Sequence, residues 1–179
     1  MTRSARAPWA AALLLLLAGS CADVEERLLP DCTDVARLAI VAQSVPDAAY
    51  VPCVAGLPAG WTFEGIEVSD AGAELRLESD RNDRGVRVEL RDRCDATDAT
   101  PIAPRDEGVR TYQVVEAISP RVVGRVLDVF PGGCVITSYD FVRGRHVALV
   151  AELGQVVGLR TRLELSQELR SRLGITLDP

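Results

Sequence analysis

Hydrophobic and polar residues alternate through most of the middle of this chain. In the stretch 85–92 the apolar residues are Val86, Val88 and Leu90, each separated from the next by a charged residue, and Leu75 and Leu77 repeat the pattern in the stretch 73–80. A period of two is typical of a strand with one face buried and the other in water. Strands are therefore predicted at about 61–69, 73–80, 85–92, 110–118, 121–130 and 134–142, with Gly, Pro and Asn residues in the turns.

At both ends of this region the apolar residues take a helical spacing. Helices are predicted at about 34–44, 145–157 and 162–173; Asp31 or Thr33 can cap the first, Pro46 stops it, and Gly174 stops the last. Residues 45–60 and 94–108 are expected to be loops, with a short edge strand at 175–177. The prediction is an α+β fold: an antiparallel, mostly meandering sheet of about six strands, with an N-terminal helix and two C-terminal helices packed on one side.

The first residues follow a different pattern. Arg3 and Arg6 precede an uncharged run of 16 residues, Ala7 to Ala22, that contains five consecutive leucines. A helix that crosses a bilayer needs roughly 20 apolar residues, so the run favours an export signal, with an uncleaved anchor as the alternative. The predicted organisation is a signal peptide at 1–20, a short membrane-proximal segment at 21–31 and a single domain at 32–179.

The end of this run, Ala18-Gly19-Ser20-Cys21, resembles the lipobox of bacterial lipoproteins. In that family the cysteine thiol receives a diacylglyceryl group and becomes the mature N-terminus, so the resemblance implies lipid attachment at Cys21. Two acyl chains are what stable anchoring requires. The family favours Leu three residues before the cysteine, whereas Ala18 stands there and Leu17 is four residues before. An ordinary signal peptide cut after Ser20 or Ala22 is the alternative.

The chain has five cysteines, an odd number for an exported protein. If Cys21 carries lipid, the other four can form two disulfides, which belong to an oxidising compartment outside the cytoplasm. Cys32 and Cys53 bracket the first helix and its loop, and Cys94 and Cys134 each flank a predicted strand, so Cys32–Cys53 and Cys94–Cys134 are favoured over the two other pairings. The expected location is the outer face of the cytoplasmic membrane, with secretion as the alternative.

Charge limits the partners of the mature protein. Without residues 1–20 the chain has 18 basic and 26 acidic residues, a net charge of −8. Nucleic-acid binding depends on neutralising phosphates, so this balance argues against it, and it equally argues against electrostatic adhesion to anionic lipid. Contact with the membrane is therefore expected through the N-terminal lipid anchor.

Several loops of the body resemble those of uncharacterised exported proteins of actinobacteria. The resemblance spans most of the mature chain, but it rests on loops and cysteines and implies no known activity. The segments are Val51-Pro52-Cys53, Leu57-Pro58-Ala59-Gly60-Trp61 and Phe130-Pro131-Gly132-Gly133-Cys134-Val135.

Few residues suggest catalysis or metal binding. His146 is the only histidine; Ser138 and Asp140 are near it in sequence, but no G-x-S-x-G motif is present. The cysteines lack the C-x-x-C spacing of zinc sites. The segment 80–85 has the first oxygen residues and the glycine of a calcium loop, but Arg91 stands where the twelfth position requires Glu. The sequence thus indicates no catalytic residue, metal or cofactor.

The sequence is compatible with two classes of function. The first is a non-enzymatic, membrane-anchored lipoprotein of the cell envelope that binds an envelope protein or a small-molecule ligand as an accessory module. The alternative is an exported hydrolase with an acidic site near residues 92–107. If the protein is a hydrolase, we expect a cleft lined by carboxyls of raised pKa. If it is a binding module, we expect an apolar cavity between sheet and helices or an exposed flat patch. The acidic residues are Asp92, Asp95, Asp98, Asp106 and Glu107.

Overall fold

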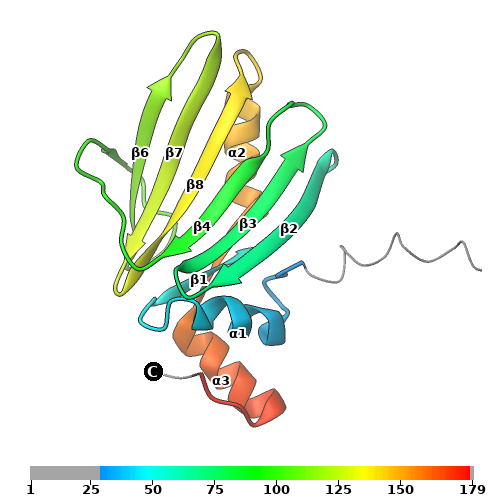
Figure 1. Ribbon diagram of the computed structural model, residues 1–179, viewed down its shortest axis with the longest axis vertical. Coiled ribbons are helices and arrows are strands. Elements are labelled where there is room, and N and C mark those ends of the chain that lie inside the picture. Colours follow the sequence, from blue (N-terminus) through cyan, green and yellow to red (C-terminus); the bar gives the residue numbers. More distant parts are fainter. Residues whose placement is uncertain (1–28, 178–179) are drawn as a thin grey trace, which may run out of the picture.

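The computed structural model describes residues 29–177 and has α+β architecture (Figure 1). Its helices are α1 (Val35–Gln43), α2 (His146–Val156) and α3 (Arg162–Leu173). Its strands are β1 (Tyr50–Val54), β2 (Trp61–Ser69), β3 (Gly72–Ser79), β4 (Val86–Arg91), β5 (Thr100–Ile102), β6 (Arg110–Ala117), β7 (Arg121–Phe130), β8 (Gly133–Val142) and β9 (Val157–Thr161). Among these described residues no helix is long and apolar enough to cross a membrane.

Seven strands form one antiparallel sheet in the order β2-β3-β4-β8-β7-β6-β5. Two meanders, β2–β4 and β5–β8, meet where β4 pairs with β8. The connection from β4 to β5 therefore has to carry the chain from the middle of the sheet to its far edge. Strands β1 and β9 form a separate two-stranded antiparallel sheet.

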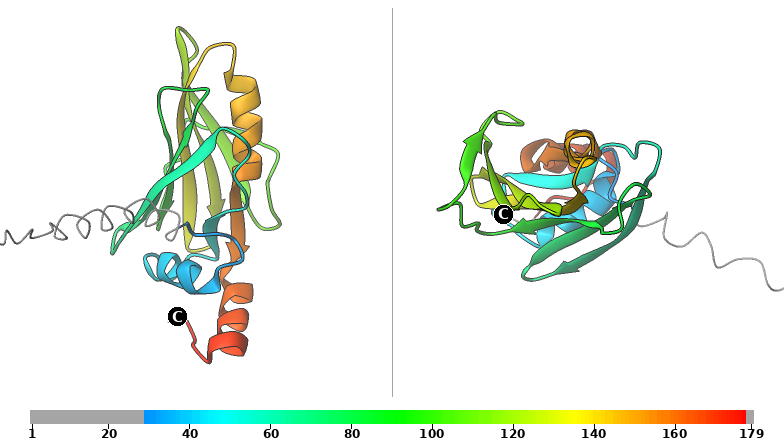
Figure 2. Two further views of the ribbon diagram at one scale, coloured as in Figure 1. Left: turned by 90° about the vertical axis from the view of Figure 1, so that its right-hand side faces the viewer. Right: turned by 90° about the horizontal axis from the view of Figure 1, so that it is seen from above.

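The sequence predicted that all three helices pack on one side of the sheet. This prediction is wrong for two of them. Helix α2 lies along one face, which we call the inner face, and the sheet curves around that side (Figure 2). Helices α1 and α3 lie together at one end of the molecule, beyond the end of the sheet (Figures 1 and 2). The small sheet explains this placement, because β9 runs directly from α2 into α3 and carries α3 past the sheet.

The alternation in the sequence separates the two faces of the large sheet. Leu75, Val88 and Phe141 point to the inner face and are fully buried in the core, whereas Arg76 and Arg87 point to the outer face, where both form ion pairs with Glu74. The half of the sheet formed by β2, β3 and β4 is thus apolar inside and charged outside, which is the arrangement that a period of two predicts.

Three strands lie in segments where none was predicted. Strand β1 lies within the expected 45–60 loop; it contains Pro52, which argues against a strand in sequence but is tolerated at the edge of a sheet. Strand β5, only three residues long, lies within the expected 94–108 loop. Strand β9 follows helix α2 without a turn, so its apolar residues appeared to continue the helix. No strand forms at 175–177, and the cap of α1 is Asp34, whose carboxylate accepts from Arg37 N at 3.1 Å.

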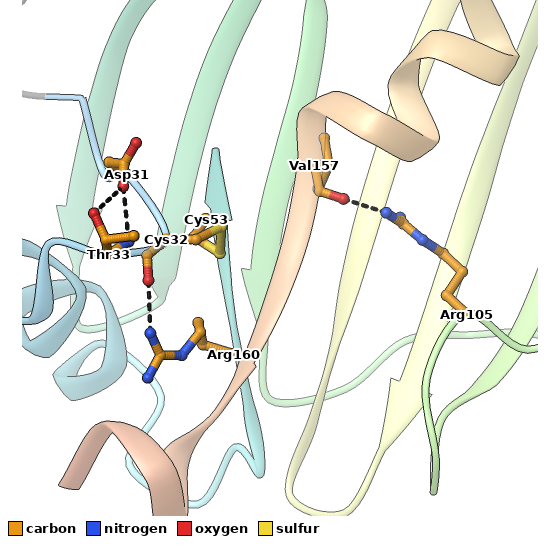
Figure 3. Close-up of a disulfide and its surroundings, with 7 residues drawn as sticks. All are labelled: Asp31, Cys32, Thr33, Cys53, Arg105, Val157 and Arg160. Atoms are coloured by element: carbon orange, nitrogen blue, oxygen red, sulfur yellow. Dashed lines mark hydrogen bonds between the residues drawn. A yellow bond between two sulfur atoms is a disulfide. The ribbon is translucent and has the colours of Figure 1, made fainter. Parts of the chain in front are cut away.

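The structure contains the two disulfides that the sequence favours, whereas Cys21 lies outside the described residues. Cys32–Cys53 joins the segment before α1 to strand β1, and Arg160 from β9 donates a hydrogen bond to Cys32 O at 2.8 Å (Figure 3). Opposite Cys53, strand β9 has Gly158. A Cβ atom at residue 158 would lie 2.8 Å from Cys32 Sγ and 3.2 Å from Cys53 Sγ, so the glycine makes room for the disulfide.

The second disulfide, Cys94–Cys134, attaches the β4–β5 connection to the start of β8 on the outer face. Here the connection covers an apolar part of that face, where Leu127 is 1 % exposed. Both disulfides are consistent with a protein that matures outside the cytoplasm.

We predict that Gly158→Val destabilises the protein by about 1–3 kcal/mol, because the added side chain collides with both disulfide sulfurs. The free energy of unfolding in urea measures the loss. Gly56→Val is the matched control, since a Cβ atom at residue 56 meets no other atom within 4 Å. In the Cys32→Ala/Cys53→Ala background, Gly158→Val should lower the free energy of unfolding by less. An equal cost in both backgrounds would contradict the steric explanation.

Candidate functional site

Two neighbouring pockets that share Val150 lie between helix α2 and the inner face of strands β6, β7 and β8, and together we call them the groove. Its wide half has a volume of about 560 Å³ and is lined mainly by aliphatic side chains. Its narrow half has a volume of about 330 Å³, and Val150 of α2 lines both halves. Pockets of roughly 300–1,000 Å³ with mostly apolar walls and a few polar groups are typical of small-molecule sites. The wide half is lined by Gln113, Val115, Ile118, Val122, Tyr139, Arg143, His146, Val147, Val150 and Ala151, and the narrow half by Ile102, Arg105, Thr111, Val126, Thr137, Val150, Leu153 and Gly154.

The position of α2 creates this groove. Leu149, Leu153 and Val156 are the buried residues of the helix, and they anchor it to the core. Because residues three or four apart share a helix face, Val147, Val150, Ala151 and Gly154 follow one another along the side that faces the groove. The exposed Val147 (70 %) and Ile118 (67 %) mark the open rim.

On its other side, α2 is held to the sheet by Glu152. The Glu152 carboxylate accepts from Trp61 Nε1 of β2 at 2.6 Å and from Arg81 Nη1 at 2.7 Å, and Arg81 Nη2 makes a second bond to it. These bonds, first that from Arg81 and then that from Trp61, lower the pKa of Glu152 below its ordinary value. They tie the helix to the start of β2 and to the β3–β4 turn, on the side away from the groove.

The floor of the wide half is formed by Tyr139. This side chain is 3 % exposed, and its hydroxyl accepts from Gln113 Nε2 at 3.1 Å. The hydroxyl can lie above β7 only because residue 124 is a glycine: a Cβ atom there would be 2.7 Å from Tyr139 Oη and 2.6 Å from Val114 O. The ring and the missing Cβ together shape the groove at this point.

Two polar atoms in the groove wall make no hydrogen bond to any other residue that the structure describes. They are Thr137 Oγ1, in the narrow half, and His146 Nδ1, in the wide half. Thr137 is only 2 % exposed. Buried polar groups are nearly always paired, and leaving one unpaired costs about 1–3 kcal/mol. Such orphaned groups are therefore candidates for contacts with a ligand.

The narrow half ends at a buried ion pair. Asp128 is fully buried and accepts from Thr111 Oγ1 at 2.8 Å and from Arg105 Nη1 at 3.1 Å. Arg105 also donates to Val157 O (Figure 3). Burial raises the pKa of Asp128, and the charge of Arg105 offsets part of this effect. Because both carboxylate oxygens are bonded and no part of Asp128 is exposed, we interpret it as a structural bridge between the β5–β6 loop, β7 and β9.

The residues considered for acyl transfer do not come together. Ser138 and Asp140 point to the outer face of β8, while His146 begins α2 and lines the groove on the inner side. Asp140 is bonded to Arg84 and Arg121 instead. The geometry therefore provides no nucleophile beside the histidine.

The acidic residues of 92–107 are divided between two loops, and Asp95 and Asp98 line one small pocket of about 160 Å³. Asp95 accepts from Thr97 N at 2.9 Å and Thr97 Oγ1 at 2.6 Å, which lowers its pKa, the opposite of what a general acid requires. Asp92 forms an ion pair with Arg93. Glu107 lies further along, in the β5–β6 loop, where its carbonyl accepts from Tyr50 Oη.

The segment 80–85 is the turn between β3 and β4. Within it, Asn82 Oδ1 accepts from Val142 N at 3.1 Å, and Asn82 Nδ2 donates to Asp140 O at 2.9 Å, so this side chain holds the turn against β8. Within residues 29–177 no group of three or more His, Cys, Asp or Glu side chains could hold a metal ion.

Sequence reasoning missed the groove residues Thr137, Arg105 and Asp128. One signal was available: on β7, Val122, Val126 and Asp128 have the same strand parity, so Asp128 is a charged residue in a buried position. Arg105 lies in a loop, and nothing in the sequence places it near Asp128.

No family model, curated protein or solved structure matches this chain.

We predict that Glu152→Gln lowers the thermal midpoint, because the Arg81 ion pair is lost while an oxygen remains for Trp61. Since the pKa of Glu152 is lowered in the folded state, its stabilisation is complete above the ordinary carboxyl pKa and is lost as pH falls through the folded value. The gap in midpoint between wild type and variant should therefore be constant near neutral pH and close in acid. Glu64→Gln is the control, because it removes an exposed carboxylate whose one side-chain bond within residues 29–177 is to Thr62. A gap that persists unchanged in acid would contradict the ion pair.

Proposed function

We propose that this protein is a non-enzymatic lipoprotein of the cell envelope, anchored at the outer face of the cytoplasmic membrane through Cys21, and that it binds a small, largely apolar ligand in the groove beside α2. The observation that carries the binding function is the groove itself, which has two halves that meet at Val150, mainly aliphatic walls and two polar atoms without a partner among the described residues. An apolar cavity between sheet and helix is the feature expected of a binding module, whereas the hydrolase alternative requires carboxyl groups close together in a cleft.

The two disulfides support the export part of the proposal, because such bonds persist in oxidising compartments. The anchor part rests on the resemblance of residues 18–21 to a lipobox and on the odd number of cysteines. Leu29, the first described residue, is eight residues after Cys21. A fully extended chain of that length spans at most roughly 30 Å, so an anchored domain would stay close to the lipid surface.

For the anchor, we predict that intact-mass analysis of the membrane fraction finds a diacylglyceryl group on the mature N-terminal Cys21. Cys21→Ser should abolish this mass, whereas Cys94→Ser, which removes a cysteine of the domain, should retain it. An unmodified wild-type protein in the soluble fraction would refute the anchor while leaving the groove untouched.

For the groove, the mature chain from residue 22 onward suits a binding test, because it includes every residue of the described core and both disulfides. Produced without the lipidated cysteine, it needs no detergent that would compete for the site. The uncharged fluorophore N-phenyl-1-naphthylamine should bind saturably. Peptide mapping without reductant verifies that each variant carries both disulfides.

We predict that Ala151→Leu and Gly154→Leu each weaken probe binding by about tenfold, equivalent to roughly 1.4 kcal/mol of lost contact. Ala151 lines the wide half; Gly154 lines the narrow half, and a Cβ atom at residue 154 meets open space, so the larger side chain can be accommodated without a backbone clash. Ala148→Leu is the matched control, because Ala148 is an exposed residue of the same helix outside the groove. Equal affinity in all variants would refute the site.

A further inference from the structure

The geometry points to the chemical class of the ligand: a single-chain amphiphile with an anionic head group. Its head lies at the wide end beside Arg143 and His146, and its alkyl chain runs along Val150 toward Thr137. This inference rests on the proposed ligand-binding function and adds to it the charge, the shape and the orientation of the occupant.

The charge of the groove is opposite to that of the protein. The mature chain carries a net charge of −8, yet the lining of the wide half contains Arg143 and His146 and no carboxylate. Most arginines of the described chain are neutralised in ion pairs with Asp or Glu. Arg143 forms no ion pair or hydrogen bond with any residue between 29 and 177. An anionic group is the natural complement of this unpaired guanidinium.

His146 provides a second polar contact at the same end. Its Nδ1 atom is buried and lacks a partner within the described part of the chain. Both Arg143 and His146 border the wide half, so one carboxylate or phosphate group at this end can accept from both. A neutral or cationic head group would leave the guanidinium without its complement.

The narrow end cannot serve as the head-group site. Its cation, Arg105, already donates to Asp128 and to Val157 O, and Asp128 is buried beside it. An incoming anion would have to compete with this pair and would face the Asp128 carboxylate. The polar group left over at this end is the uncharged Thr137 hydroxyl. The asymmetry sets the orientation, with the charge at the wide end and the chain at the narrow end.

The space between the two ends suits an alkyl chain. From His146 to Gly154 the helix rises about 12 Å, at roughly 1.5 Å per residue. Along this length the helix presents Val147, Val150 and Ala151, and the sheet presents Val122 and Val126. An aliphatic channel of this form accommodates one extended chain, and the polar side chains Gln113 and Tyr139 in its lining already bond to each other.

The test displaces N-phenyl-1-naphthylamine from the mature chain with four ligands that share a ten-carbon chain and differ in the head group. The ligands are decanoate, decyl phosphate, decanol and decyltrimethylammonium, each kept below its micelle-forming concentration. We expect the two anions to bind about three- to tenfold more tightly than decanol, as for a partly exposed charge-assisted contact. The cation should bind most weakly. High salt should reduce the preference for anions, because an exposed charge pair is screened.

Arg143→Gln should lower the affinities for the two anions toward the affinity of the same variant for decanol, so that the preference for anions is lost. Arg110→Gln is the matched control: Arg110 is also exposed and forms no ion pair with any described residue, but it begins β6 outside the groove lining. Comparing decanoate with decyl phosphate distinguishes a carboxylate from a phosphate head group, and a preference for either anion supports the inference.

The outcomes separate this inference from the function on which it rests. If neither the probe nor any ligand binds, the groove is not a ligand site and both fail. If the probe and decanol bind but the anions bind no more tightly, or if Arg143→Gln leaves the ranking intact, the amphiphile assignment is overturned and the binding function stands. Binding to anionic vesicles without binding to the monomeric ligands would also overturn it.

Discussion

The contact of Glu152 with Trp61 and Arg81 is the constraint on which the rest of this structure depends. One helix of 11 residues cannot cover the inner face of a seven-stranded sheet. The Glu152 carboxylate ties α2 to Trp61 of β2 and to Arg81 in the β3–β4 turn, and the helix buries Leu149 and Leu153 in the core. The β6–β7 half is consequently left with aliphatic residues facing open space. The groove therefore results from where the helix is held, and its apolar walls are the part of the inner face that the helix does not reach.

The second constraint is the path of the chain between the two meanders. The β4–β5 connection crosses to the far edge of the sheet and has little secondary structure of its own. Cys94–Cys134 attaches its beginning to β8, and after β5 the Arg105–Asp128 pair attaches the β5–β6 loop to β7. The first attachment covers apolar residues on the outer face, and the second closes the narrow end of the groove. The disulfide and the ion pair thus hold one side of the site in shape.

The sequence predicted the long elements well and the short ones poorly. The alternation around Val88 and the helical spacing after Arg162 each reflect burial over many residues, so the strands and helices appear close to their expected bounds. Strands β1 and β5 are short and contain proline, and their pairing depends on partners far away in the chain. The disulfide partners could be favoured because each cysteine flanked a predicted element. The sequence predicted an apolar cavity only as a kind of site, and it singled out the groove residue His146 in a different role.

By itself, the sequence determined which residues of each element are buried, because burial imposes a periodicity that the chain has to carry in its own order. It also determined the four cysteines available for pairing and the acidic balance of the mature chain. Only the tertiary structure decided which buried faces meet. Ser138 and His146 are eight residues apart in sequence but lie on opposite sides of β8, while Arg105 and Asp128, which are 23 residues apart, form an ion pair. A site depends on distances between elements, and those distances are set by packing contacts that local periodicity does not encode.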